Sequence, residues 1–190
     1  MLRRSLFLVR HGQYDTEDST AREGGLTETG RAQARQVAQR LRGMQFDATY
    51  CSTLRRAEET AAIIAAELPG AEVQRARVLC ECVPCIPPAF AHYFTKTKPE
   101  EIEHGAAQSL AAYERFFKRP GRANRRELLV CHGNLIRSFV CRALGLPIES
   151  WLNLNTHNCG LTIIHVFGDG LRIMESFNDI GHLPAELHTR

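Results

Sequence analysis

Short apolar runs alternate along the chain with longer segments whose apolar residues recur every three or four positions. Runs of the first kind predict buried strands, and segments of the second kind predict helices with one face against a core. The expected strands cover residues 5–10, 47–52, 73–79, 128–131, 161–167 and 171–177, and the expected helices cover 27–43, 57–68, 102–117 and 135–144. This order predicts an α/β fold with a mostly parallel sheet, helices on both of its faces and an antiparallel C-terminal edge hairpin.

No repeat, linker or low-complexity tract interrupts this order, so we expect residues 1–190 to form a single domain. The chain is 44% hydrophobic and 24% charged, which is typical of a globular protein and excludes a disordered one. No apolar run reaches the roughly 18 residues that a transmembrane helix needs. The net charge of +3 is too small to indicate nucleic-acid binding. We therefore expect neither nucleic acid nor a membrane as a partner.

The seven cysteines are odd in number, and the few residues before the first strand are too short for a secretory signal. We expect free thiols in a reducing intracellular compartment. Cys80, Cys82 and Cys85 form a short cluster that has some likeness to a zinc site. Because no second cysteine pair accompanies the cluster and prolines interrupt its spacing, we expect no metal ion and no other cofactor.

Charged and reactive side chains follow the expected strands at the points where these end. Arg10 and His11 follow the first strand, Arg56 comes one helical turn after the second, Glu81 follows the third, and His132 follows the fourth. The carboxyl ends of parallel strands meet at one edge of a sheet, where α/β folds bind their ligands. We therefore expect these five side chains to converge on one site.

The residue types at this edge favour an anion over a metal ion. Two histidines are obvious metal ligands, but Arg10 and Arg56 would place two fixed positive charges beside a dication. A phosphoryl group, with a charge near −2, fits better. Gly12 and Gly133 would let the backbone approach this ligand, and the helix that begins at about Asn134 would add its first amides to the anion site.

A histidine in such a field can act as the nucleophile, because nearby cations depress its pKa and keep a ring nitrogen lone pair free. Glu81 is suited to protonate the leaving oxygen, since its proline-bounded loop would raise its pKa. In the alternative interpretation, Arg10 and Arg56 merely pair on the surface with Glu58 or Glu59. Five other histidines have no comparable placement and are expected to be structural or solvent-facing: His92, His104, His157, His165 and His188.

Four motifs occur in order along the chain: Leu8-Val9-Arg10-His11-Gly12, Leu26-Thr27-x-x-Gly30-x-x-Gln33-Ala34, Ser52-x-x-x-Arg56-Ala57-x-Glu59-Thr60 and Cys131-His132-Gly133. They resemble the signatures of the histidine phosphatase superfamily, whose fold is phosphoglycerate-mutase-like, and the resemblance extends from about Leu6 to Pro184. It implies that His11 is the phosphorylated nucleophile and that Glu81 is the acid/base. The residues expected to bind the phosphoryl group are Arg10, Arg56 and His132, with Gly12, Gly133 and Asn134 beside them.

Further segments resemble one branch of this superfamily, the mitochondrial protein serine/threonine phosphatases: 10–14, 131–137, 140–144 and 178–184. The resemblance implies phosphoserine or phosphothreonine on proteins as substrate and a mitochondrial location, or a cytoplasmic one for a soluble relative. Two features depart from the pattern. Glu17 stands where many members have asparagine, and this sequence does not include the anchoring and regulatory segments of that branch, as expected of either a trimmed chain or a soluble relative.

The expected function is a metal-independent phosphatase that works through a phosphohistidine. A phosphoglycerate mutase is the first alternative, but 190 residues leave little room for the lid that would keep water from the intermediate. A small-metabolite phosphatase is the second, and a non-catalytic docking module is the third, which the presence of His11, Arg56 and His132 disfavours. The loop 82–98 carries aromatic and basic residues suited to a phosphorylated protein partner, and a homodimer is compatible with the sequence.

Overall fold

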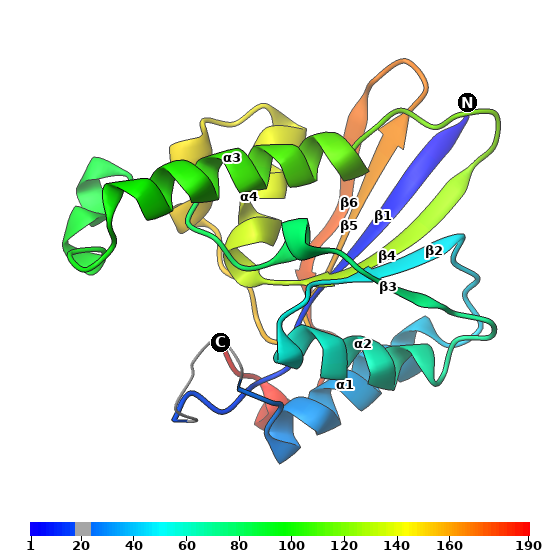
Figure 1. Ribbon diagram of the computed structural model, residues 1–190. Helices are drawn as coiled ribbons and strands as arrows, with labels where there is room; N and C mark the ends of the chain where they lie inside the picture. Colours follow the sequence, from blue (N-terminus) through cyan, green and yellow to red (C-terminus); the bar gives the residue numbers. More distant parts are fainter. Residues whose placement is uncertain (18–23) are drawn as a thin grey trace.

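The computed structural model describes residues 1–17 and 24–190, and within these residues the strands form one six-stranded sheet (Figure 1). The order across the sheet is β3-β2-β4-β1-β5-β6. The strands are β1 (Arg3–Arg10), β2 (Ala48–Cys51), β3 (Val73–Arg75), β4 (Arg125–Cys131), β5 (Leu161–Phe167) and β6 (Arg172–Asp179). β1 to β4 run parallel to one another, whereas β5 and β6 form an antiparallel hairpin at the edge of the sheet opposite β3. The predicted sheet is confirmed.

The helices cover both faces of this sheet, as predicted (Figure 1). They are α1 (Glu28–Leu41), α2 (Arg55–Ala65), α3 (Pro99–Phe116) and α4 (Gly133–Leu144), and short 3-10 turns cover Arg77–Leu79, Pro88–Tyr93, Ile148–Asn153 and Ala185–Leu187. Leu6 and Leu8 of β1 pack towards α3 and α4, whereas Phe7 and Val9 pack towards α1 and α2. Burial on both faces explains why β1 is a continuous apolar run.

The path of the chain through the sheet brings two distant segments together. After β1 the chain passes to β2 and β3, and it then returns to place β4 between β2 and β1. β1 and β4 are in parallel register, with Arg10 opposite Cys131. The residues that follow these two strands therefore emerge side by side at the carboxyl edge, where the strand order reverses and α/β folds bind ligands.

The third strand is shorter than predicted. It ends at Arg75 instead of residue 79, and the chain then forms the turn Arg77–Leu79. β3 is an edge strand that pairs only with β2, and its side chains are partly or fully exposed. The turn points Leu79 into the core against α3 and α4, where it is fully buried. Burial of this leucine overrides the weak alternation that predicted a longer strand.

Other boundaries also differ from the sequence expectation. β1 begins at Arg3 because it pairs with β4 and β5 at its first residues. The loop after residue 80 contains the turn Pro88–Tyr93, and the turn Ile148–Asn153 follows α4 without a periodic signal. No described helix is long and apolar enough to cross a membrane.

Candidate active site

The end of β1 holds His11 in a fixed position. The backbone N–H of His11 donates to the carbonyl oxygen of Cys131 on the neighbouring strand (2.9 Å), and the Asn158 side chain donates to the backbone carbonyl oxygen of His11 (3.0 Å). The residue is 2% exposed. Its Nδ1 lies 2.8 Å from the carbonyl oxygen of Gly12. A carbonyl only accepts, so Nδ1 carries the proton and Nε2 keeps its lone pair.

The surroundings of His11 keep its ring neutral. Burial lowers the pKa of His11 well below its ordinary value, and the charges of Arg10 and Arg56 lower it further, against the opposing effect of the Gly12 carbonyl. Burial is the largest cause of this shift, ahead of the two cations from which it was predicted. The result is the predicted one, a neutral imidazole whose Nε2 can attack an electrophile.

The two predicted arginines reach the same place from different elements. The Arg56 Nε–H on α2 donates to Nε2 of His11 (3.2 Å). The Arg10 guanidinium donates to the Thr156 carbonyl oxygen (2.6 Å), and its buried Nε has no partner among the described residues. The alternative in which these arginines pair on the surface with Glu58 or Glu59 is wrong, because Glu58 pairs with Arg75, and Glu59 pairs with Arg31 and Arg55.

His132 follows β4 and lies beside His11, with 4.9 Å between the ring centroids. Its Nε2 is 2.8 Å from the Ser52 hydroxyl, and its Nδ1 is buried with no partner in the part of the chain that is described. Burial, His11 and the two arginines lower its pKa well below the ordinary value. Ser52 was given no role by the sequence analysis, although it directly follows β2, which neighbours β4.

Glu81 reaches the site from a different direction than predicted. It follows the turn Arg77–Leu79 rather than a strand end, and its carboxylate accepts the N–H of Cys82 (3.2 Å) and of Asn134 at the start of α4 (3.5 Å). Burial raises the pKa of this carboxyl group above its ordinary value, although Arg10 and both N–H groups act against the rise. The direction of the shift agrees with the expectation for a general acid.

The two predicted ligand-approach glycines have another structural reason. A Cβ at Gly12 would lie 2.5 Å from the carbonyl oxygen of Gly30 in the first turn of α1. A Cβ at Gly133 would lie 2.8 Å from the Thr156 hydroxyl and 3.4 Å from Nε of Arg10. Gly12 therefore allows the loop after β1 to pack closely on α1, and Gly133 allows the Arg10 side chain to pack closely on α4. Asn134 contributes its N–H to Glu81, as described above, so one amide at the start of α4 faces a carboxylate.

Tyr14 is a site residue to which the sequence analysis assigned no role. Its ring meets the His11 ring edge-on at 5.3 Å between centroids, and the Arg56 guanidinium lies 4.4 Å above its centre. This cation–π contact helps to hold the guanidinium beside His11. The signal in the sequence was its position three residues after His11, within a stretch that was recognised only as a branch motif.

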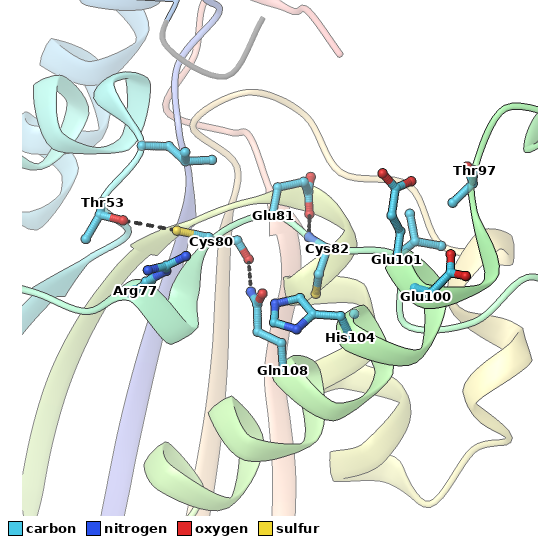
Figure 2. Close-up of a pocket in the computed structure, with 13 residues that line it drawn as sticks. Thr53, Arg77, Cys80, Glu81, Cys82, Thr97, Glu100, Glu101, His104 and Gln108 are labelled. Atoms are coloured by element: carbon cyan, nitrogen blue, oxygen red, sulfur yellow. Dashed lines mark hydrogen bonds between the residues drawn. The ribbon is translucent and has the colours of Figure 1, made fainter.

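Two cavities flank these side chains. One of about 380 Å³ is lined by Arg10, Tyr14 and Glu17, so the glutamate that departs from the family pattern shares a cavity with Arg10. A larger one of about 650 Å³ has Glu81 on its wall (Figure 2). His104, which was expected to have no role, lines this second cavity. Both cavities include exposed side chains, so solvent reaches each side of the site.

The chemistry of the assembled side chains suits a phosphoryl group. The guanidinium groups of Arg10 and Arg56 act on the neighbouring imidazoles of His11 and His132, and Nε of Arg10 and Nδ1 of His132 have no hydrogen-bond partner among the described residues. Within residues 1–17 and 24–190, no three or more His, Cys, Asp or Glu side chains are grouped as a metal site would need. Cys80, Cys82 and Cys85 are free thiols.

Residues 6–83 and 87–179 match the histidine phosphatase superfamily (branch 1). The chain therefore belongs to the histidine phosphatase superfamily, as its motifs indicated. It is 38% identical to the serine/threonine-protein phosphatase Pgam5, mitochondrial, of Caenorhabditis elegans, over 95% of this chain and 64% of that protein. The serine/threonine-protein phosphatase PGAM5, mitochondrial, of Homo sapiens is 33% identical to this chain, over 98% of this chain and 66% of that protein. The chain thus spans about two thirds of the length of these relatives.

Solved structures agree with this fold. The phosphoglycerate mutase of Plasmodium falciparum superposes with a TM-score of 0.67 at 28% identity and covers 97% of this chain and 96% of its own. A phosphoserine phosphatase of Entamoeba histolytica superposes with a TM-score of 0.73 at 24% identity and covers 95% of this chain and 100% of its own. The expected phosphoglycerate-mutase-like fold is confirmed.

Proposed function

We propose that this chain hydrolyses phosphomonoesters without a metal ion, and that its substrates are phosphoserine and phosphothreonine residues of proteins. Membership of the histidine phosphatase superfamily supports the reaction class. The names of the relatives that are 33% to 38% identical support the substrate class and a mitochondrial location. The observation that carries the proposal is the buried Nε2 lone pair of His11, which lies beside Arg56 and His132.

In the first step, Nε2 of His11 attacks phosphorus and a P–N bond forms as the bond to the leaving oxygen breaks. Glu81, whose pKa is raised by burial, gives its proton to that oxygen. Arg10 and Arg56 stabilise the charge on the transferring phosphoryl group. The Nδ1–H of the phosphorylated ring stays bonded to the Gly12 carbonyl oxygen, which stabilises the positive charge that the ring acquires.

In the second step, water attacks phosphorus from the side of Glu81. The carboxylate takes a proton from the water, the P–N bond breaks, and the electron pair returns to Nε2 of His11. Inorganic phosphate leaves, with Glu81 again protonated and the ring again neutral. Both cavities beside the site are lined by exposed residues, which favours access of water over the sequestration that a mutase needs.

The test is hydrolysis of 4-nitrophenyl phosphate with excess EDTA by the parent chain, His11→Ala and the control His92→Ala. His92 is exposed and lies outside the site. Turnover that resists EDTA, disappears in His11→Ala and persists in His92→Ala supports the proposal, and an acid-labile phosphoenzyme would identify the intermediate. Turnover that EDTA abolishes contradicts it.

A phosphoglycerate mutase is the second candidate, because the 28% identical structure from Plasmodium falciparum carries that name. A comparison of a phosphothreonine peptide with 3-phosphoglycerate distinguishes the two. Release of inorganic phosphate from the peptide supports the protein phosphatase. Isomerisation of 3-phosphoglycerate without release of phosphate supports the mutase.

A further inference from the structure

The cavity beside Glu81 is a built feature of the fold. Its volume of about 650 Å³ is within the range of about 300 to 1,000 Å³ that is typical of ligand pockets. One wall is the segment around Glu81, and the facing wall is the N-terminal half of α3 (Figure 2). The side-chain N–H of Gln108 on α3 donates to the Cys80 carbonyl oxygen (2.7 Å). A Cβ at Gly105 would lie 2.3 Å from the Val83 carbonyl oxygen, so helix and loop pack closely.

The position of Glu81 assigns this cavity to one side of the substrate. His11, Arg56 and His132 lie at the carboxyl ends of the central strands and gather around the phosphoryl position. Glu81 stands at the border, because its carboxylate accepts an N–H of α4 and also lines the cavity. A general acid must reach the leaving oxygen within a hydrogen bond. The atoms that follow this oxygen therefore extend past Glu81 into the cavity.

The charge of the cavity is opposite to that of the chain. The chain has a net charge of +3, but three carboxylates line the cavity, those of Glu81, Glu100 and Glu101, against the single guanidinium of Arg77. When Glu81 holds its proton, two carboxylates on α3 still oppose Arg77. Among residues 1–17 and 24–190, neither Glu100 nor Glu101 forms an ion pair with another residue. Figure 2 shows both on the α3 wall, across the cavity from Arg77.

This charge separates the candidate substrates. A small acidic phosphoester such as 3-phosphoglycerate would bring its carboxylate towards Glu100 and Glu101, and like charges repel. A peptide with lysine or arginine beside the phosphorylated residue would place a cation there. A cavity of this volume also has room for such a side chain.

We propose that the cavity lined by Glu81, Glu100 and Glu101 is the subsite for the leaving-group side of the substrate and selects phosphopeptides with a basic residue next to the phosphorylated one. The inference rests on the proposed protein phosphatase function and adds a preference among its substrates. Glu100 and Glu101 are its specificity-determining residues.

The experiment measures kcat/KM for two phosphothreonine peptides that differ only in having lysine or glutamate on both sides of the phosphothreonine. The parent chain should prefer the lysine peptide by about three- to tenfold, the size expected for two solvent-exposed ion pairs. The double variant Glu100→Gln/Glu101→Gln should reduce the preference to less than about twofold. Glutamine at position 101 can still accept the Lys98 N–H that caps α3, so the helix start is preserved.

Glu103→Gln is the matched control. Glu103 is an exposed glutamate of the same helix that does not line the cavity, so this variant should keep the preference of the parent. Equal kcat/KM values for the two peptides in the parent, or an unchanged preference in the double variant, overturn the subsite assignment and leave the protein phosphatase proposal standing. Hydrolysis of neither peptide, with 4-nitrophenyl phosphate still turned over, overturns both.

Discussion

Gly30 provides a test in which helix propensity and tertiary packing predict opposite signs. It lies in the first turn of α1, where alanine is favoured over glycine by about 1 kcal/mol. A Cβ at this position, however, would lie 2.0 Å from the carbonyl oxygen of Gln13, far inside van der Waals contact. The obstacle is backbone, which cannot rotate away as a side chain can. Gly30→Ala therefore forces the loop after His11 to move.

The expected cost follows from these two terms. Overpacking of a tight contact costs about 1 to 3 kcal/mol and occasionally more, and a contact as short as this one belongs at the upper end of that range. Helix propensity offsets about 1 kcal/mol of this cost. We therefore expect Gly30→Ala to lower the free energy of unfolding by about 1 to 3 kcal/mol. A chain of this size then loses about 2 to 4 °C in Tm for each kcal/mol. Activity should fall as well, because Gln13 is two residues from His11.

Thermal unfolding by calorimetry, together with 4-nitrophenyl phosphate turnover, tests this expectation. Gly121→Ala is the matched control, since a Cβ there would meet nothing within 4 Å. That variant should keep the parent Tm within about 2 °C, as an ordinary surface substitution does, and should keep the parent turnover. If Gly30→Ala melts at or above the parent temperature, the packing argument for this loop is wrong.

Three further predictions concern the chemistry of the site. First, kcat/KM for an alkyl phosphate should fall as pH rises through the raised pKa of Glu81, because only the acid form donates a proton. A pH profile of Glu81→Gln should lack this fall. The activity lost in Glu81→Gln should be smaller with 4-nitrophenyl phosphate than with an alkyl phosphate, because the nitrophenolate leaving group needs less protonation. Second, Ser52→Ala removes the partner of Nε2 of His132 (2.8 Å) and should lower kcat/KM by about five- to tenfold, the value of one buried hydrogen bond; steady-state kinetics with unchanged kcat/KM would show that the bond is not needed. Third, Tyr14→Phe keeps an aromatic ring under Arg56 and should stay within about twofold of the parent, whereas Tyr14→Leu should lower kcat/KM by roughly three- to thirtyfold; equal kinetics of the two variants would exclude a role for the ring.

The convergence of the main site residues could be predicted because it depends on topology more than on detail. Arg10 is the last residue of β1, His11 and His132 directly follow β1 and β4, and parallel strands end at one edge of a sheet. The alternation of strands and helices is enough to predict that arrangement. The position of Arg56, one helical turn after β2, is sufficient to predict that it joins this site, since α2 starts beside the same edge of the sheet.

What the sequence could not predict is which distant atoms fill the space around each residue. Gly12 and Gly133 were assigned to ligand approach, but their neighbours are Gly30 and Thr156, which no local pattern identifies. The contact of Tyr14 with Arg56 likewise joins residues 42 positions apart in the sequence. Tyr14 lies in the loop after β1, which has no periodicity, and Arg56 lies on α2. The third strand ended early because core packing of one leucine outweighed weak alternation. Each of these depends on tertiary contacts, which a single sequence does not contain.

The two halves of the proposed reaction are supported by different parts of the fold. His11 and His132 are fixed by hydrogen bonds at the ends of central strands, which are paired on both sides and buried on both faces. Glu81 instead lies on a loop held by α3 and by one N–H of α4. Changes in α3 or in the loop after residue 80 can therefore alter the cavity on the leaving-group side without moving the nucleophile. In the proposed reaction, the rigid sheet therefore carries the step common to all substrates, and the loop carries the selection among leaving groups.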